Sequence, residues 1–227
     1  MAETERKWLP EQIDREIGLV DFLYRSVLGD SGSLLQQAYD RGVRAQAASE
    51  PLRILDIGCG TGNTLRGLTL HTRRHLPNLA IQAVGVNIED FSNKSRSPAT
   101  RRAIAAQEIA YILGDAAELP LKDGGFDLIY EHELLVHSTG PEAVRRLKEM
   151  ERVLAPGGRM YFGTDGQTEL LQPMRDLRES GYTVQGVKWT LIDPRPGQAA
   201  TRMLFYVDKP VEDLPPQSAD NAYDLNI

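Results

Sequence analysis

The sequence predicts an α/β fold in which helices cover both faces of a mostly parallel sheet. Five short apolar runs are typical of buried strands: residues 52–58, 80–88, 109–116, 126–132 and 159–165. Each run is separated from the next by enough residues for a helix or a long loop. Strands that alternate with helices favour a parallel sheet with right-handed crossovers.

The helices are predicted from apolar spacing and from capping residues. Residues 11–28 carry apolar side chains at three- and four-residue steps, which indicates an amphipathic helix. A second helix is expected to begin at a serine cap, Ser31 or Ser33. Residues 63–76 have helical spacing, and residues 140–158 predict a helix that ends at Pro-Gly-Gly.

The C-terminal part predicts a hairpin and a tail. Residues 182–193 and 201–209 are expected to be two antiparallel strands. Residues 210–227 are rich in proline and acid, so we expect them to be mostly disordered. The predicted organisation is an N-terminal helical cap over residues 1–50, a main domain over residues 51–209, and this tail.

Composition limits the function classes. Of the 227 residues 41% are hydrophobic, and the net charge is −6, which suits a globular protein and disfavours general nucleic-acid binding. The basic run His71 to Pro77 is interpreted as the solvated end of a helix. The single cysteine, Cys59, forms no internal disulfide, and neither a secretory signal nor a run of about 18 apolar residues is found. We therefore expect a soluble cytoplasmic protein without a membrane partner.

The stretch "ILDIGCGTGN", residues 54–63, places a glycine-rich turn between a strand and a helix. Such a turn lets the backbone approach a ligand, and the following helix offers unpaired N–H groups. The dinucleotide pattern G-x-G-x-x-G fails because Gly62 comes one position early, and no Gly-Lys-Ser/Thr follows for a phosphate loop. Asp56, directly before the turn, suits a cationic ligand.

Five motifs in order resemble those of class I S-adenosylmethionine-dependent methyltransferases, of the type that acts on small molecules. They are "ILDIGCGTG", "VGVNIE", "ILGDAAELPL", "FDLIYEHELLVH" and "RVLAPGGRMYF". The resemblance covers residues 51–209. It implies a Rossmann-like three-layer sandwich with a seven-stranded, mostly parallel sheet and an antiparallel last strand. It also implies S-adenosyl-L-methionine as the cofactor.

The resemblance assigns the glycine loop to the methionine part of the cofactor. Gly58, Gly60 and Gly62 would wrap this part, and Asp56 would hold its amino group, directly or through water. Cys59 lies within the loop and is expected to pack under the turn, in preference to acting as a reactive thiol.

The adenosine part is assigned to the ends of the next strands. The resemblance implies that Asp115 accepts a hydrogen bond from the adenine amino group and that Ala116 supplies a backbone N–H. It also implies that the backbone of Tyr130 contacts the methionine end.

Asn87 departs from the family pattern, which places an acid there to accept from both ribose hydroxyls. A neutral amide accepts only through its oxygen. Asn87 and the adjacent Ile88 are still expected to contact the cofactor, and Glu89 could supply a second acceptor or, with Asp90, be an exposed loop acid.

The predicted catalytic residues follow the fourth strand. His132 is the first candidate for a general base because its ordinary pKa lies near neutrality, and Glu131 lies beside it at the mouth of the site. A pocket wall or a helix cap is the alternative role for His132. A structural role is expected for His137, and no metal site is predicted.

Three functions stay open from the sequence. The first is methyl transfer to a small natural-product or lipid-like acceptor. The second keeps the cofactor but methylates a protein or RNA, which the negative net charge disfavours. The third binds S-adenosylmethionine without transferring its methyl group. The sequence does not set the oligomeric state, and a homodimer is among the options.

Overall fold

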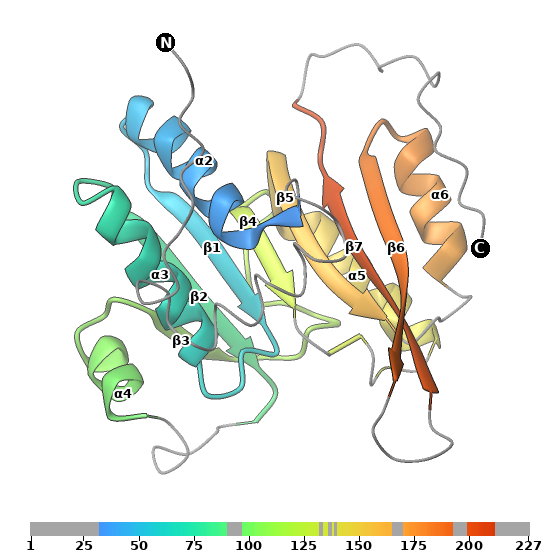
Figure 1. Cartoon of the computed structure of the whole chain (residues 1–227), viewed down its shortest axis with the longest axis horizontal. Coiled ribbons are helices and arrows are strands. Elements are labelled where there is room, and N and C mark those ends of the chain that lie inside the picture. Colours follow the sequence, from blue (N-terminus) through green and yellow to red (C-terminus); the bar gives the residue numbers. More distant parts are fainter. Residues whose placement is uncertain are drawn as a thin grey trace.

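The computed structural model describes residues 32–89, 97–131, 134, 135, 138, 140–164, 170–192 and 199–211. Within this part of the chain, one sheet has the strand order β3-β2-β1-β4-β5-β7-β6 (Figure 1). The strands are β1 (Leu52–Ile57), β2 (Ile81–Asn87), β3 (Ala110–Leu113), β4 (Phe126–Glu131), β5 (Leu154–Thr164), β6 (Thr183–Ile192) and β7 (Ala199–Asp208).

The sheet confirms the predicted fold class. Strands β1 to β5 pair in parallel, whereas β7 runs antiparallel between β5 and β6. The predicted C-terminal hairpin is formed by β6 and β7. The chain moves outward from β1 to β2 and β3 and then returns to β4 on the other side of β1. In open α/β sheets, ligands bind outside the carboxyl ends of the strands at such a reversal.

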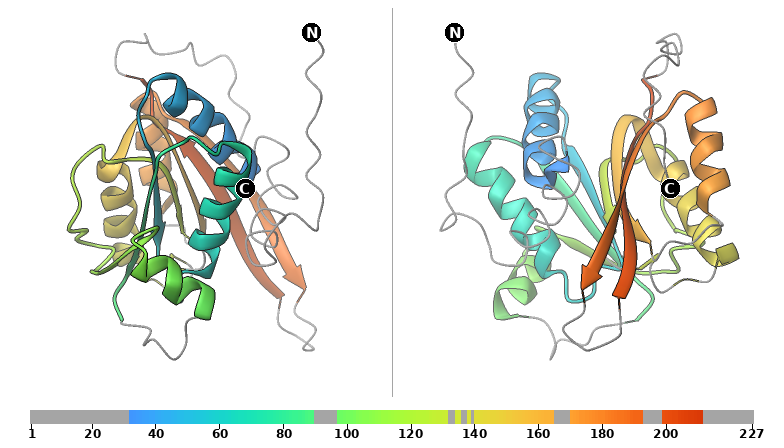
Figure 2. Two further views of the ribbon diagram at one scale, coloured as in Figure 1. Left: turned by 90° about the vertical axis from the view of Figure 1, so that its left-hand side faces the viewer. Right: turned by 45° about the vertical axis from the view of Figure 1, so that its right-hand side comes forward.

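Helices cover both faces of the sheet. They are α2 (Leu34–Ala47), α3 (Asn63–His75), α4 (Pro98–Ala105), α5 (Gly140–Val153) and α6 (Leu171–Glu179). Residues of α2, α3 and α4 belong to the core cluster on one face, and residues of α5 and α6 to the cluster on the other (Figure 2). The three-layer arrangement is therefore as predicted.

Helix α2 is the described part of the predicted N-terminal cap. Ser33 is its N-cap, and the Ser33 hydroxyl accepts a hydrogen bond from the backbone nitrogen of Gln36 at 3.1 Å. Gly42 allows α2 to approach the end of α3, because a Cβ atom at Gly42 would lie 2.6 Å from Leu76 Cδ1. The helix predicted over residues 11–28, Ser31 and most of the predicted tail lie outside the described residues.

The junction between α5 and β5 differs from the sequence prediction. Helix α5 ends at Val153, and Leu154 already pairs with Phe126 of β4. The register then shifts, so that Leu128 pairs with Arg159. The residues in between are accommodated by Gly157, whose φ of 69° lies in the left-handed region. The Pro-Gly-Gly sequence thus belongs to an irregular strand entry and not to the helix end.

The basic run at the end of α3 is only partly solvated. Arg73, Arg74 and His75 occupy the last turn of the helix, as predicted. His71 is buried, contrary to the expectation of a solvated run. Burial, followed by the positive charges of His75 and Arg74, lowers the pKa of His71 to about 4.

Candidate cofactor site

The predicted cofactor residues come together at the carboxyl edge of the sheet. The glycine loop joins β1 to α3, Asn87 ends β2, Asp115 follows β3, and Tyr130 lies near the end of β4. Because the strand order is β3-β2-β1-β4, these ends are neighbours along one edge (Figure 1). The site therefore lies at the chain reversal between β1 and β4.

Each glycine of the loop has a backbone conformation that disfavours other residues. The φ angles of Gly58, Gly60 and Gly62 are 73°, 51° and 77°. The nitrogens of Gly58 and Cys59 both donate to the Val86 carbonyl, at 2.9 and 3.1 Å, which fixes the turn to β2. Gly62 donates to the Cys59 carbonyl at 2.8 Å. The spacing of the three glycines thus follows from the shape of the turn.

The outer side of the loop is open at Gly60. Among the described residues, no atom lies within 4 Å of the position that a Gly60 Cβ would take. A ligand can therefore approach the loop backbone here. The side chain of Cys59 points inward, since its Sγ lies 2.7 Å from the position of a Cβ on Gly85. It packs against β2 under the turn, as expected from the sequence.

Asp56 is a buried carboxylic acid beneath the loop. Its side chain is 3% exposed, and its Oδ2 accepts a hydrogen bond from the Tyr130 hydroxyl at 2.7 Å. Burial raises the pKa of Asp56 to about 7; the Tyr130 hydrogen bond lowers it, and the negative charge of Glu131 raises it. An approaching cation would favour the ionised form. The sequence predicted a cofactor contact only for the backbone of Tyr130. The contact of its hydroxyl with Asp56 was not predicted.

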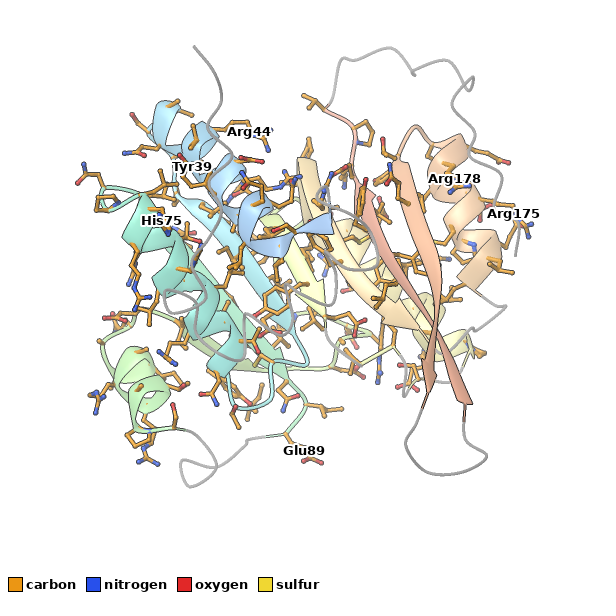
Figure 3. All side chains as sticks on the ribbon, in the orientation of Figure 1. Tyr39, Arg44, His75, Glu89, Arg175 and Arg178 are labelled. Carbon is orange, nitrogen blue, oxygen red and sulfur yellow. The ribbon has the colours of Figure 1, made fainter. Side chains whose placement is uncertain are left out.

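The segment after β2 is held by two hydrogen-bond donors. Asn87 Nδ2 donates to the Glu89 carbonyl at 2.9 Å, which leaves the Asn87 side-chain oxygen as its acceptor. The Tyr111 hydroxyl lies 3.2 Å from the carbonyls of both Gly60 and Glu89 and so links the glycine loop to this segment. The exposed Glu89 carboxylate points away from the sheet (Figure 3). Tyr111 was not anticipated from the sequence.

The ends of β2 and β3 carry exposed apolar side chains beside a polar turn. Ile88 is 68% exposed and Leu113, which pairs with Asn87, is 57% exposed. Asp115 is exposed, and its Oδ1 accepts from the Ala117 nitrogen at 2.9 Å. Ala116 is buried. An apolar surface with an adjacent carboxylate suits a flat ring that carries an amino group.

Glu131 lies at the end of β4 and is fully buried. Its Oε1 accepts from the Gly163 nitrogen at 2.7 Å, and its Oε2 accepts from the nitrogens of Leu134 and Leu135 at 2.7 and 3.2 Å. Both oxygens thus bind backbone amides, which favours a positioning role over proton transfer. His132 and His137 lie outside the described residues, so their roles stay predictions.

Residues 55–162 match the family model described as a methyltransferase domain. The matched segment contains the glycine loop, Asn87, Asp115 and Tyr130. This segment is a class I S-adenosylmethionine-dependent methyltransferase domain. The predicted family and its cofactor, S-adenosyl-L-methionine, are confirmed.

Two relatives illustrate the range of this methyltransferase family. Sterol 24-C-methyltransferase of Schizosaccharomyces pombe is 32% identical over 122 residues, which cover 53% of this chain and 28% of that protein. The 27-O-demethylrifamycin SV methyltransferase of Amycolatopsis mediterranei is 28% identical over 146 residues, which cover 62% of this chain and 50% of that protein. The chain thus spans half or less of the length of these relatives.

A solved structure supports the fold of the methyltransferase domain. The cyclase SpnF superposes with a TM-score of 0.52 at 18% identity, covering 78% of this chain and 81% of that chain. At this identity the similarity shows the fold alone.

The residues of the methyltransferase domain fit the chemistry of the cofactor. S-adenosylmethionine carries an ammonium group and a sulfonium group, and Asp56 and the open side of Gly60 suit a cation that approaches the backbone closely. The exposed pair Ile88 and Leu113 suits the adenine ring. These residues, which lie at neighbouring strand ends, thus suit the methionine part and the adenosine part of the cofactor.

Proposed function

We propose that this protein transfers a methyl group from S-adenosylmethionine to a small-molecule acceptor. The observation that carries the proposal is the buried Asp56 beneath an open glycine loop. The relatives act on a sterol and on a rifamycin, which favours a natural-product or lipid-like acceptor. Among the described residues, no helix is long and apolar enough to cross a membrane.

Methyl transfer in this site needs orientation above all. When bound, the cofactor would supply an activated methyl group on positively charged sulfur for in-line transfer to the acceptor atom. Asp56 would hold the amino group, and the amides of the glycine loop would fix the methionine part. Orientation of this kind supplies on the order of 7 to 11 kcal/mol of barrier reduction.

A general base is required only for an acceptor that arrives protonated. His132 keeps this role in the proposal, because it follows directly on the buried end of β4 and its ordinary pKa lies near neutrality. Glu131 would instead hold the backbone after β4 in position. We further propose that transfer needs no metal and takes place in the cytoplasm.

Two other functions share the cofactor site. The second candidate is a protein that binds the cofactor but does not transfer its methyl group, because one fold can host several chemistries. Methylation of RNA or protein would draw on exposed arginines such as Arg74, Arg101 and Arg102, but the net charge of −6 opposes it.

The first experiment is calorimetric titration with S-adenosylmethionine and S-adenosylhomocysteine. Binding of both is expected. No binding at millimolar ligand to demonstrably folded protein would contradict all three functions. The second experiment supplies methyl-labelled cofactor together with a cell extract that contains metabolites, RNA and protein. A labelled small molecule in the mass spectrum supports the proposal, whereas labelled RNA or protein, or binding without transfer, supports an alternative.

A further inference from the structure

One register row of the sheet connects the candidate site to a series of tyrosines. Residues directly opposite each other on paired strands project from the same face of the sheet. We call the following set the Asp56 row, from β3 to β6: Tyr111, Gly85, Asp56, Tyr130, Tyr161, Tyr206 and Gln185. Tyr130 is thus the neighbour of Asp56 on β4, across the chain reversal.

The contact between Asp56 and Tyr130 is short and buried. The Tyr130 hydroxyl donates to Asp56 Oδ2 at 2.7 Å, and the two residues are 3% and 1% exposed. The two residues lie directly opposite each other on the paired strands β1 and β4. The bond occupies Oδ2 and leaves Oδ1 of the same carboxylate for a ligand.

A buried carboxylate needs a hydrogen-bond donor to stay ionised. Ionisation without a partner is strongly disfavoured in an apolar interior. A phenol hydroxyl that donates to the carboxylate stabilises the charged form and restricts the side chain to one orientation. The Tyr130 hydroxyl meets both requirements, directly under the loop that is expected to hold the methionine part.

We propose that Tyr130 is a positioning residue for the cofactor. Its hydroxyl favours the ionised form of the Asp56 carboxylate and orients it toward the amino group of the methionine part. This inference rests on the proposed function, because it requires Asp56 to bind that amino group. It differs from the family assignment of this position, which concerns only the backbone.

The other groups around Asp56 have different effects. Glu131, the next residue on β4, adds a negative charge that opposes ionisation of Asp56. On the β2 side, Gly85 contributes no side chain, and the thiol of Cys59 packs over it. Among the described residues, the Tyr130 hydroxyl is thus the titratable neighbour that favours the charged form of Asp56.

The test is titration of S-adenosylhomocysteine into wild-type protein and the Tyr130→Phe variant from pH 5.5 to 8.5. The wild-type affinity should rise with pH as Asp56 ionises. Tyr130→Phe should bind about tenfold more weakly at pH 7, and the midpoint of its pH dependence should move to higher pH. The matched control is Tyr206→Phe, a buried tyrosine of the same row on β7, which should leave both quantities unchanged.

A second ligand separates positioning from general damage. 5′-Methylthioadenosine lacks the amino acid part, so Tyr130→Phe should bind it as the wild type does. Equal weakening of both ligands, or an unchanged affinity and pH midpoint for S-adenosylhomocysteine, would overturn the inference. Failure of the wild type to bind either ligand would instead contradict the proposed function.

If Tyr130→Phe does not fold, 3-fluorotyrosine at position 130 provides the test. The fluorinated ring keeps the hydroxyl and makes it more acidic, which strengthens its donation to Asp56. The pH midpoint of binding should then move to lower pH. A midpoint identical to that of the wild type would overturn the inference.

Discussion

The burial of Asp56 lowers the stability of the folded protein at neutral pH. Its pKa rises from 3.8 to about 7 because the carboxylate is buried. Between these two pH values the folded protein binds more protons than the unfolded chain. The free energy of unfolding contributed by this group therefore falls as the pH rises from about 4 to 7, and it stays low above pH 7.

The variant Asp56→Asn should separate stability from binding. The amide removes the buried charge and can still accept from Tyr130 through its oxygen. We expect the free energy of unfolding at pH 8 to rise by about 1 to 3 kcal/mol and the gain to shrink toward pH 5. Urea denaturation at both pH values measures this, while calorimetry should show loss of S-adenosylhomocysteine binding.

A matched control for this variant is Asp115→Asn. Asp115 is exposed, and its Oδ1 contact with the Ala117 nitrogen is also available to an asparagine. Its free energy of unfolding should be unchanged at both pH values. A stability gain in Asp115→Asn equal to that of Asp56→Asn would refute the role of burial.

Gly60→Ala should impair binding more than it impairs folding. The φ of 51° disfavours any side chain, and a methyl group here would project toward the open side of the loop. We expect a loss of about 1 to 2 kcal/mol in the free energy of unfolding and at least about a tenfold loss of S-adenosylhomocysteine affinity.

The control for the glycine loop is Gly157→Ala. Gly157 also has a left-handed φ, 69°, but lies at the entry of β5, away from the site. It should lose at least as much stability, because a Cβ at Gly157 would lie 3.1 Å from Val211 Cγ2, and it should keep its affinity for S-adenosylhomocysteine. Similar loss of affinity in both variants would show that strain alone, and not the position in the loop, weakens binding.

At the scale of elements, Glu131 connects the end of β4 to the end of β5. Its carboxylate accepts from Gly163 with one oxygen and from Leu134 and Leu135 with the other. Glu131→Gln retains one acceptor and adds an amino group, which must disrupt one of the two contacts. We expect a loss of about 1 to 3 kcal/mol in the free energy of unfolding and slower methyl transfer.

The pH profile of transfer distinguishes positioning from catalysis in the Glu131→Gln variant. If Glu131 positions the backbone, kcat should fall by the same factor at every pH. If it is the general base, the acidic limb of the profile should disappear. Glu179→Gln, at the exposed C-terminal end of α6, controls for the loss of one negative charge and should behave as wild type.

The sequence predicted elements better than it predicted contacts. Apolar runs and helical spacing depend on neighbouring residues, so β1, α3 and the β6–β7 hairpin are close to their predicted bounds. The entry of β5 at Leu154 was missed because it depends on pairing with Phe126. The spacing of residues along the sequence does not reveal which strands pair.

The same limit applies to the candidate site. The loop glycines and Asp56 were predicted because the motif is contiguous. The backbone of Tyr130 was predicted to contact the cofactor, but the contacts of the Tyr130 and Tyr111 hydroxyls with Asp56 and Gly60 were not, because they depend on the strand register. Glu131 was predicted as catalytic from its position, whereas its three amide donors come from backbone that the sequence does not place.

At the scale of the whole molecule, a partly buried charge cluster connects helix α2 to strand β7. Asp208 of β7 binds Arg159 of β5 through two contacts of 2.6 Å, and it also binds Arg41 of α2 at 3.2 Å. Arg41 donates to the Gly157 carbonyl as well. Burial lowers the pKa of Arg41 to about 10, and the charge of Asp208 opposes this effect.

The members of this cluster should differ strongly in their effect on stability. Asp208→Asn leaves two buried guanidinium groups without their carboxylate, so the free energy of unfolding should fall by about 3 to 5 kcal/mol. Arg41→Met keeps similar volume and leaves the Asp208–Arg159 pair intact, so the loss should stay below about 1.5 kcal/mol.

Urea denaturation of both single variants and of the double variant tests this ranking. In Arg41→Met, the Asp208→Asn change removes the carboxylate from Arg159 alone, so the two losses should not add. The double variant should therefore be more stable than the sum of the single losses implies. Additive losses, or a greater loss from Arg41→Met than from Asp208→Asn, would mean that Asp208 does not couple α2 to β7.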